Sequence, residues 1–317
     1  MLLACLMACA AGSVAWAADT YPTKPIRLVL NVGTGGVGDV SMRLAAQHMS
    51  RNLGQQIVVD NRPSAGGAAA AMAVVNAAPD GYTLLQTGNA AAISASLFKK
   101  LPYDVVRDFQ QISSISFFEL VVLATPESRF TRLADLIAYA QQNAGKLNIG
   151  TINVGSTQYL SAELLKSMAG IQAQVVPFKS NTLLLTALRG NELPVAFELV
   201  GPALTHIRSG ALKALAVGSE RRFGGLPDVP TVAEAGVPGF SVYSWTGMSA
   251  PARTPRPIID RLAQEVAAAV AVPDVKQKLQ DLGIEARAMT PDETRKMMMS
   301  DIAKWKAVIE RSGIERQ

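Results

Sequence analysis

The sequence has very few of the residues that most often perform catalysis or hold metals. Of its 317 residues, two are cysteines and two are histidines. Cys5 and Cys9 both fall within the first seventeen residues, so the rest of the chain lacks a disulfide, a thiolate nucleophile and a cysteine metal site. His48 and His206 have no serine and aspartate partners in a recognisable triad arrangement. These absences predict a protein without catalytic residues, bound metal or cofactor.

The chain has only a small excess of positive charge. Lysine and arginine number 30 against 25 aspartates and glutamates, which gives a net charge of +5. No run of basic residues interleaved with aromatics appears, which argues against a nucleic-acid partner. Hydrophobic residues make up 49% of the chain, enough for a core, so the composition excludes a disordered chain. The length fits roughly two α/β domains.

The first seventeen residues have a different composition from the rest. They carry no charge and end in the small-x-small sequence Ala15-Trp16-Ala17, which is typical of a secretory signal and its cleavage site. The segment is too short to span a bilayer comfortably, and it lacks a basic leading region. A lipoprotein-type signal is an alternative because of the two cysteines. We therefore expect residues 1–17 to be removed and the product to be periplasmic.

Beyond the leader, strand patterns alternate with helix patterns. Strands are predicted at 26–32, 56–60, 82–86, 120–124, 147–152, 175–178, 195–199, 212–217 and 241–248. Helices are predicted at 39–52, 66–78, 131–143 and 156–169, from Pro257 and Pro273, and after the capping box Thr290-Pro291-Asp292-Glu293. This alternation predicts an α/β fold with mixed sheets flanked by helices.

Two stretches, 26–49 and 147–168, share one plan: a buried strand, a polar glycine turn and an amphipathic helix. A helix N-terminus offers unpaired N–H groups and about +0.5 charge, so two of them facing one space would clamp a small carboxylate. Ordinary strand-to-helix turns also use small residues, and the pattern alone leaves both interpretations open.

Two further motifs suggest enzymes. Residues 33–38 match G-x-G-x-x-G, and Asp60 ends the next strand, as in dinucleotide-binding sites. Against this alternative, Asp39 would place a negative charge where a pyrophosphate must bind. Residues 96–99 match S-x-x-K, but the partner motifs of serine β-lactamases are absent from the sequence.

A colinear set of motifs covers essentially the whole chain after the leader. It comprises Tyr21-Pro22-Thr23-Lys24-Pro25-Ile26-Arg27, Gly35-Gly36-x-x-Asp39, Val59-Asp60-Asn61-Arg62-Pro63, Ala65-Gly66-Gly67, Ala78-Pro79-Asp80-Gly81-Tyr82, Lys100-Leu101-Pro102-Tyr103-Asp104, Gly145-Lys146-Leu147-Asn148, Lys166-Ser167-Met168-Ala169-Gly170 and Leu226-Pro227-Asp228-Val229-Pro230-Thr231 through Gly236. In these motifs the chain resembles the Bug family, the substrate-binding proteins of tripartite tricarboxylate transporters.

The resemblance implies a periplasmic-binding-protein type II fold with two lobes, each a central mixed β-sheet flanked by helices, and a hinge between them. Lobe I would comprise residues 18–120 and 247–317, and lobe II residues 121–246, with hinge crossings near 118–124 and 243–248. A small carboxylate would be held between the turns 32–39 and 151–157. The expected partners are this ligand and the membrane components of a tripartite transporter, or a sensor, with the protein a monomer.

The resemblance also suggests a set of binding residues. These are Val32, Gly33, Thr34, Gly35, Gly36 and Asp39 in the first turn, Thr87, Gly88 and Asn89 after the third strand, Thr151, Asn153, Gly155, Ser156 and Thr157 in the second turn, and Phe178, Lys179 and Glu198 at later strand ends. Asp39 could cap its helix or meet a ligand ammonium, Lys179 could add charge or be solvated, and Glu198 could face the ligand or be structural. Several of these positions depart from the common family pattern, so the ligand's identity does not carry over.

Export is the first testable prediction. Protein isolated from its native host should begin near Ala18 or Asp19 when its intact mass is measured. An unprocessed chain that retains Met1 in the cytoplasm would contradict the export signal.

Overall fold

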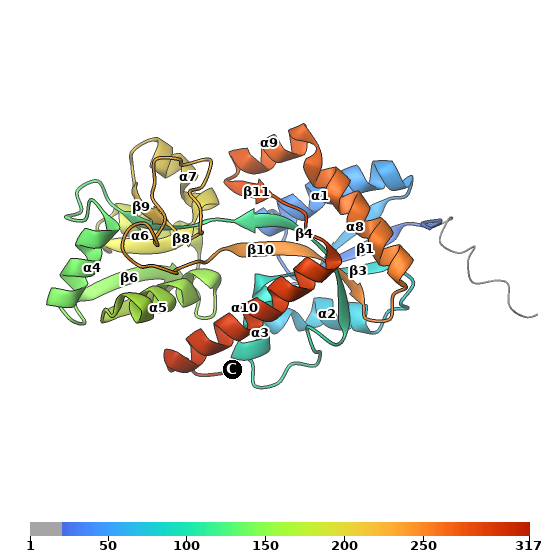
Figure 1. The fold of residues 1–317 in the computed structure, drawn as a ribbon, viewed down its shortest axis with the longest axis horizontal. Helices are drawn as coiled ribbons and strands as arrows, with labels where there is room; N and C mark the ends of the chain where they lie inside the picture. The colour runs from blue at the N-terminus through green and yellow to red at the C-terminus, as the bar shows by residue number, and fades with distance from the viewer. Residues whose placement is uncertain (1–20) are drawn as a thin grey trace, which may run out of the picture.

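The computed structural model describes residues 21–317, so the leader expected at residues 1–17 lies outside the described residues. The fold is α/β, with two mixed sheets flanked by helices, as the sequence predicts (Figure 1). None of the helices in the described part of the chain combines the length and the apolar character of a membrane span.

Sheet I has six strands in the order β11-β4-β10-β3-β1-β2. The strands are β1 (Ile26–Leu30), β2 (Ile57–Asn61), β3 (Thr83–Gly88), β4 (Phe109–Phe118), β10 (Ser244–Pro251) and β11 (Ile284–Ala286). The helices around it are α1 (Val37–Leu53), α2 (Ala68–Val75), α3 (Asn89–Leu97), α8 (Arg256–Ala271), α9 (Pro273–Asp281) and α10 (Pro291–Arg311). Alternate side chains of β1 point to opposite faces. Leu28 packs in a cluster with α1 and α8, whereas Val29 packs in one with α2.

Sheet II has five strands in the order β7-β6-β8-β5-β9. They are β5 (Leu120–Ala124), β6 (Leu147–Ile152), β7 (Ala173–Phe178), β8 (Val195–Leu199) and β9 (Lys213–Val217). Helices α4 (Leu133–Gln142), α5 (Thr157–Ala169), α6 (Asn181–Arg189) and α7 (Val200–Arg208) surround it. The two faces again carry separate clusters: Phe197 packs in one that includes residues of α4 and α5, and its neighbour Ala196 in one that includes residues of α6 and α7.

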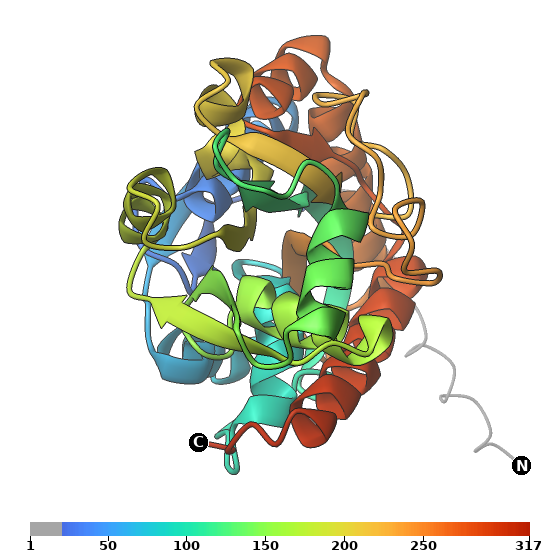
Figure 2. The same ribbon diagram turned by 90° about the vertical axis from the view of Figure 1, so that its left-hand side faces the viewer.

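The chain passes between the sheets twice. It leaves β4 at Phe118 and enters β5 at Leu120, and it returns through residues 218–243 into β10. The long C-terminal helix α10 lies beside both parts, against α3 and β4 at one end and α5 at the other (Figures 1 and 2). In sheet I, β11 lies on one side of β4 and β10, β3, β1 and β2 lie on the other; in sheet II, β9 lies on one side of β5 and β8, β6 and β7 lie on the other.

Many local predictions are confirmed. The strands at 120–124, 147–152 and 195–199 match to the residue, and Thr290 and Glu293 form the predicted capping box. The continuous helix expected over 66–78 is wrong, because Gly66 and Gly67 adopt positive φ angles of 60° and 67°. That conformation interrupts the helix, so a short 3₁₀ turn precedes α2.

Sequence analysis did not find β4, the central strand that leads to the crossing. Its interior contains buried serines, which give a polar sequence without strand periodicity. Their hydroxyls are satisfied by neighbouring backbone: Ser113 donates to the Met289 carbonyl at 2.8 Å and Ser114 to the Arg287 carbonyl at 2.7 Å. A polar strand can therefore lie at the centre of the sheet without leaving these groups unpaired.

Helix α1 begins at Val37, two residues earlier than predicted, and Asp39 fixes its first turn. The Asp39 carboxylate is 2% exposed and accepts hydrogen bonds from the Gly35 N–H at 2.9 Å, from Arg43 Nε at 3.0 Å and from Asn61 Nδ2 at 2.9 Å. Burial by itself raises the pKa of Asp39, but the hydrogen bonds from Arg43, Gly35 and Asn61 outweigh burial and hold the pKa below its usual value.

Because the folded-state pKa of Asp39 is lowered, its contribution to stability is present above the unfolded pKa and is lost as the pH falls through the folded pKa. We predict that Asp39→Asn lowers the free energy of unfolding by about 1–2 kcal/mol at pH 7, as expected when a charged acceptor is lost. In urea titrations the difference from wild type should vanish at acidic pH.

A matched control is Asp274→Asn, another first-turn acid paired with a cation four residues on, but exposed. Its effect should be smaller than that of Asp39→Asn. Equal effects of the two substitutions, or an Asp39→Asn effect that persists at acidic pH, would contradict this role.

Candidate functional site

The turn after β1 leaves the first turn of α1 without a side-chain cap. Gly36 is the N-cap residue, with an extended φ of −72°, and no side chain bonds to the first helical N–H groups. Residues 33–36 are exposed, and Val32 is half-buried. Gly35 needs its glycine because its φ is 86°. Since Asp39 is neutralised by Arg43, this helix start presents free N–H groups to an anion.

The turn after β6 begins α5 in a different way. The Ser156 hydroxyl caps the helix by accepting from the Tyr159 N–H at 3.1 Å, and it donates to the Ile152 carbonyl at 2.7 Å. Gly155 has a φ of 82°, and a Cβ there would lie 2.3 Å from Leu97 of α3. This turn therefore lies directly against the end of α3, a helix that packs on sheet I.

Asn89, the first residue of α3, connects three elements. Its Nδ2 donates to Thr157 Oγ1 of α5 at 2.7 Å, and its Oδ1 accepts from Trp305 Nε1 of α10 at 2.7 Å. Asn89 and Trp305 are both fully buried. Among the candidate residues, the structure thus brings Asn89, Gly155 and Thr157 together with Leu97. The side chains of Asn89 and Thr157 join the two sheets at this point.

Glu198 is fully buried at the end of β8. Its Oε1 accepts from Gln158 Nε2 at 2.8 Å and from the Leu199 N–H at 2.7 Å. Burial raises the pKa of Glu198, against the effect of hydrogen bonds from Gln158, Leu199 and Asn181. Its Oε1 thus holds the first turn of α5 through Gln158, whereas its Oε2 is buried without a hydrogen-bond partner, so both alternatives for Glu198 stay open.

The remaining candidates divide by exposure. Thr87 and Gly88 are buried at the end of β3, and Thr151 is buried with its hydroxyl unpartnered. Asn153 and Lys179 are exposed, and Phe178 is half-buried, with its carbonyl accepting from the Asn153 N–H at 2.9 Å. The exposed part of the candidate site therefore consists mainly of backbone and small side chains. Lys179 is the one predicted residue with an exposed, charged side chain.

Sequence analysis did not name Gln158, Leu97 and Trp305, whose side chains contact Glu198, the turn at Gly155 and Asn89, respectively. Gln158 directly follows the predicted residue Thr157 on α5, but nothing in the sequence links it to Glu198, forty residues away. Within residues 21–317, no group of three or more histidine, aspartate or glutamate side chains is arranged to hold a metal ion.

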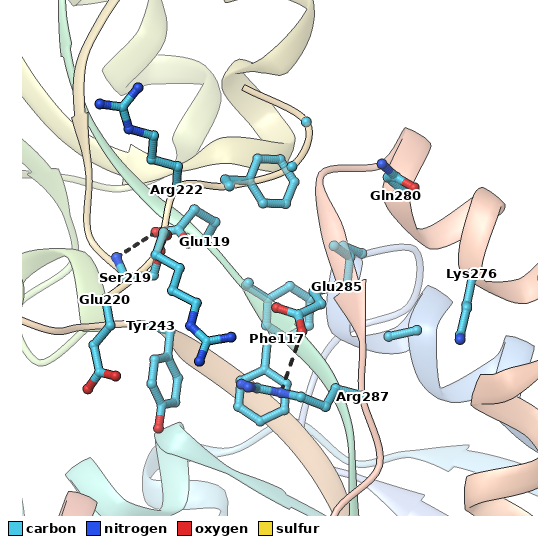
Figure 3. Close-up of a pocket in the computed structure, with 17 residues that line it drawn as sticks. Phe117, Glu119, Ser219, Glu220, Arg222, Tyr243, Lys276, Gln280, Glu285 and Arg287 are labelled. Atoms are coloured by element: carbon cyan, nitrogen blue, oxygen red, sulfur yellow. Dashed lines mark hydrogen bonds and ion pairs between the residues drawn. The ribbon is translucent and has the colours of Figure 1, made fainter. Parts of the chain in front are cut away.

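A separate cavity of about 700 Å³ lies beside the β4–β5 crossing, between the segment after β9 and the pair β11 and α9 (Figure 3). We call it the crossover cavity. It is lined by Phe117, Phe118, Glu119, residues 219–225, Tyr243, Lys276, Gln280 and residues 284–287. None of the predicted binding residues lines it.

Comparison with known proteins identifies the chain's relatives. Residues 41–314 match the model of the tripartite tricarboxylate transporter family receptor. The chain is 33% identical over 298 residues to the protein BugT of Bordetella pertussis, covering 93% of this chain and 91% of BugT.

Solved structures agree with this match. The periplasmic binding protein BugD is 28% identical, with a TM-score of 0.77, over 94% of this chain and all of BugD. A Rhodopseudomonas palustris protein solved with adipate is 31% identical, with a TM-score of 0.79, over 93% of this chain and 99% of its own. MatC from the same organism, with bound malate, is 31% identical, with a TM-score of 0.74, over 91% of this chain and all of MatC.

The matching family is one of transporter receptors, and BugD is a periplasmic binding protein. They confirm the two-sheet binding-protein fold and the expectation of a non-enzymatic protein, and they remove the dinucleotide-dependent alternative raised by residues 33–38. The match spans nearly the whole described chain, and the arrangement of sheets and helices agrees with it. The chain belongs to the tripartite tricarboxylate transporter receptor family.

Proposed function

We propose that this protein is an exported, periplasmic solute-binding protein that captures a small carboxylate-bearing ligand and delivers it to the membrane components of a tripartite transporter. The leader composition and family membership support export and the transporter. The adipate and malate present in two related structures support the ligand class. Delivery to a sensor remains the second candidate, and only the partner distinguishes the two.

The proposed lobes are residues 18–120 with 247–317, and residues 121–246. The two separate sheets and the two crossings of the chain between them support this division, although one hydrophobic cluster includes residues of both sheets and the proposed boundaries fall inside β5 and β10. Closure about these crossings, with ligand contacts from both lobes, would stabilise the bound state. We propose that the protein acts as a monomer.

The main observation in support of this function is the uncapped start of α1. Its first-turn N–H groups lack side-chain partners, and the helix dipole adds about half a positive charge there. At α5 the hydroxyls of Ser156 and Thr157 already have protein partners. We therefore assign the ligand carboxylate chiefly to backbone N–H groups, with Lys179 as the exposed cation among the predicted residues.

Ligand class can be tested on the wild-type protein. Adipate, malate and NAD are compared by thermal shift and calorimetric titration. A carboxylate at about 100 times its dissociation constant should stabilise the fold by roughly 2.7 kcal/mol. Stabilisation by NAD with no response to either carboxylate would overturn the proposal.

Gly36→Asp tests the site itself. Gly36 has an extended φ that aspartate accepts, and the nearest atom to an added Cβ lies 4.0 Å away. Aspartate is a good N-cap residue, so helix stability should hold or rise by a few tenths of a kcal/mol. Its carboxylate would occupy the N–H groups proposed for the ligand, so affinity should fall at least tenfold, or about 1.4 kcal/mol.

The control for side-chain size is Gly36→Ala, which adds a Cβ without a cap or charge. It should bind the carboxylate like the wild type in calorimetric titration. Unchanged affinity in Gly36→Asp, with folding intact, would show that the start of α1 does not hold the ligand.

A further inference from the structure

The crossover cavity has walls from both parts of the fold. Residues 219–225, which follow β9 of sheet II, form one wall, and Lys276 and Gln280 of α9 form the other together with residues 284–287. The end of β4 and Glu119 at the crossing complete the lining (Figure 3). Its volume of about 700 Å³ falls within the range of about 300–1,000 Å³ that is usual for pockets that hold small molecules.

Glu119 is the buried acid of this cavity, with 8% of its surface exposed. Its Oε1 accepts three backbone N–H groups: Leu120 at 3.0 Å, Gly218 at 2.9 Å and Ser219 at 3.0 Å. All three bonds end on Oε1, so the second oxygen, Oε2, has no backbone donor. The carboxylate is therefore fixed in position, and one of its oxygens is left to accept from a ligand.

This carboxylate has no ion-pair partner within residues 21–317. The charged and titratable groups that share the cavity are Glu220, Arg221, Arg222, Tyr243, Lys276, Glu285 and Arg287. Two of these cations are engaged elsewhere, because Arg222 pairs with Glu234 at 2.9 Å and Arg287 stacks over the Phe117 ring. A buried carboxylate without a cation is costly, and burial raises the pKa of Glu119 to about 7. A cationic ligand would relieve this cost.

Aromatic rings line the same cavity as the acid. They belong to Phe117, Phe118, Phe223 and Tyr243, and the rings of Phe117 and Tyr243 meet edge to face with their centroids 5.2 Å apart. Ring faces attract an organic cation, and they also pack well against the alkyl carbons of such a ligand. The acid and the rings together therefore favour a small molecule with an ammonium group.

Two exposed cations stand on opposite walls of the cavity. Arg221 belongs to the segment after β9 and Lys276 to α9, and neither forms an ion pair within the described part of the chain. They would repel a second positive charge on the ligand and attract a negative one. The ligand that matches both ends of the cavity is a zwitterion.

We propose that the crossover cavity is a ligand site of its own, which takes a small molecule with an ammonium group at one end and a carboxylate at the other. The ammonium group binds Glu119 Oε2 among the aromatic rings, and the carboxylate faces Arg221 and Lys276. Since the two walls come from the two parts of the fold, the bound molecule contacts both. The site shares no residue with the carboxylate site proposed at the start of α1.

Three probes of equal chain length test the two ends: 5-aminopentanoate, pentylamine and pentanoate. They are titrated into the full chain at about pH 8, above the pKa of Glu119, and followed by NMR. The amides of Leu120, Gly218 and Ser219 report on Glu119, and the Gly36 amide reports on the start of α1. We expect 5-aminopentanoate to shift the first set most tightly, pentylamine more weakly and pentanoate not at all.

The probes decide the proposal independently of the proposed function, because neither adipate nor malate is used. No shift of the three reporter amides with 5-aminopentanoate would overturn it. So would an equal response to pentanoate, or a response to pentylamine as strong as that to 5-aminopentanoate. Shifts at Gly36 alone would place the probe in the other site and would also overturn it.

Glu119→Gln removes the charge at the inner end and keeps the shape of the side chain. It should weaken 5-aminopentanoate at least about tenfold in calorimetric titration, because a buried charge partner is lost. The matched control is Glu220→Gln, an exposed carboxylate that lines the same cavity. It should bind within about twofold of the wild type. Equal effects of the two substitutions would contradict the assignment of the ammonium group.

Arg221→Gln tests the outer end and leaves the crossing intact, so it decides the matter even where Glu119→Gln does not fold. It should weaken 5-aminopentanoate by about twofold to fivefold and leave pentylamine unchanged. Arg222→Gln, which removes the arginine paired with Glu234, should change neither. Unchanged binding of 5-aminopentanoate to Arg221→Gln, or an equal loss for pentylamine, would overturn the proposal.

Discussion

The buried amide of Asn89 is the contact on which the arrangement of the two sheets depends most. Asn89 is the first residue of α3, which packs on sheet I. Its amide donates to Thr157 at the start of α5, which packs on sheet II, and accepts from Trp305 of α10. An unpaired amide in this position would cost free energy, so the three elements stabilise one another. The result is that the turn containing Gly155 lies against Leu97 at the end of α3.

The starts of α1 and α5 are built differently. The start of α5 is capped by the Ser156 hydroxyl and fixed by the hydrogen bond between Asn89 and Thr157. The start of α1 is held by Asp39, which accepts from the Gly35 N–H before the helix and leaves the first helical N–H groups free. Asp39 therefore stabilises the turn without filling the anion site, because its charge is directed to Arg43 and Asn61. This division of roles explains how an acid can stand in the first turn of a helix that is proposed to bind a carboxylate.

The sequence predicted the features that depend on local pattern: most strands, the glycine turns and the capping box at Thr290. It did not predict β4, since the buried serines there depend on partners distant in the sequence, such as the Met289 and Arg287 carbonyls, more than 170 residues away. It named Asn89, Thr157 and Glu198 but could not distinguish ligand contacts from structural contacts. Those roles depend on partners such as Trp305 and Gln158, which the fold brings close.

Glu119 shows the same limit, because an isolated glutamate between two strands carries no signal of its three backbone donors.

The central claim is that backbone N–H groups at the start of α1 hold the ligand's carboxylate. The most direct measurement is a crystal structure of the protein with adipate or malate. The account predicts a carboxylate oxygen within hydrogen-bonding distance of N–H groups in residues 36–38, with the Asp39–Arg43 pair intact. A carboxylate bound in the crossover cavity, or held without any contact to the α1 turn, would contradict it.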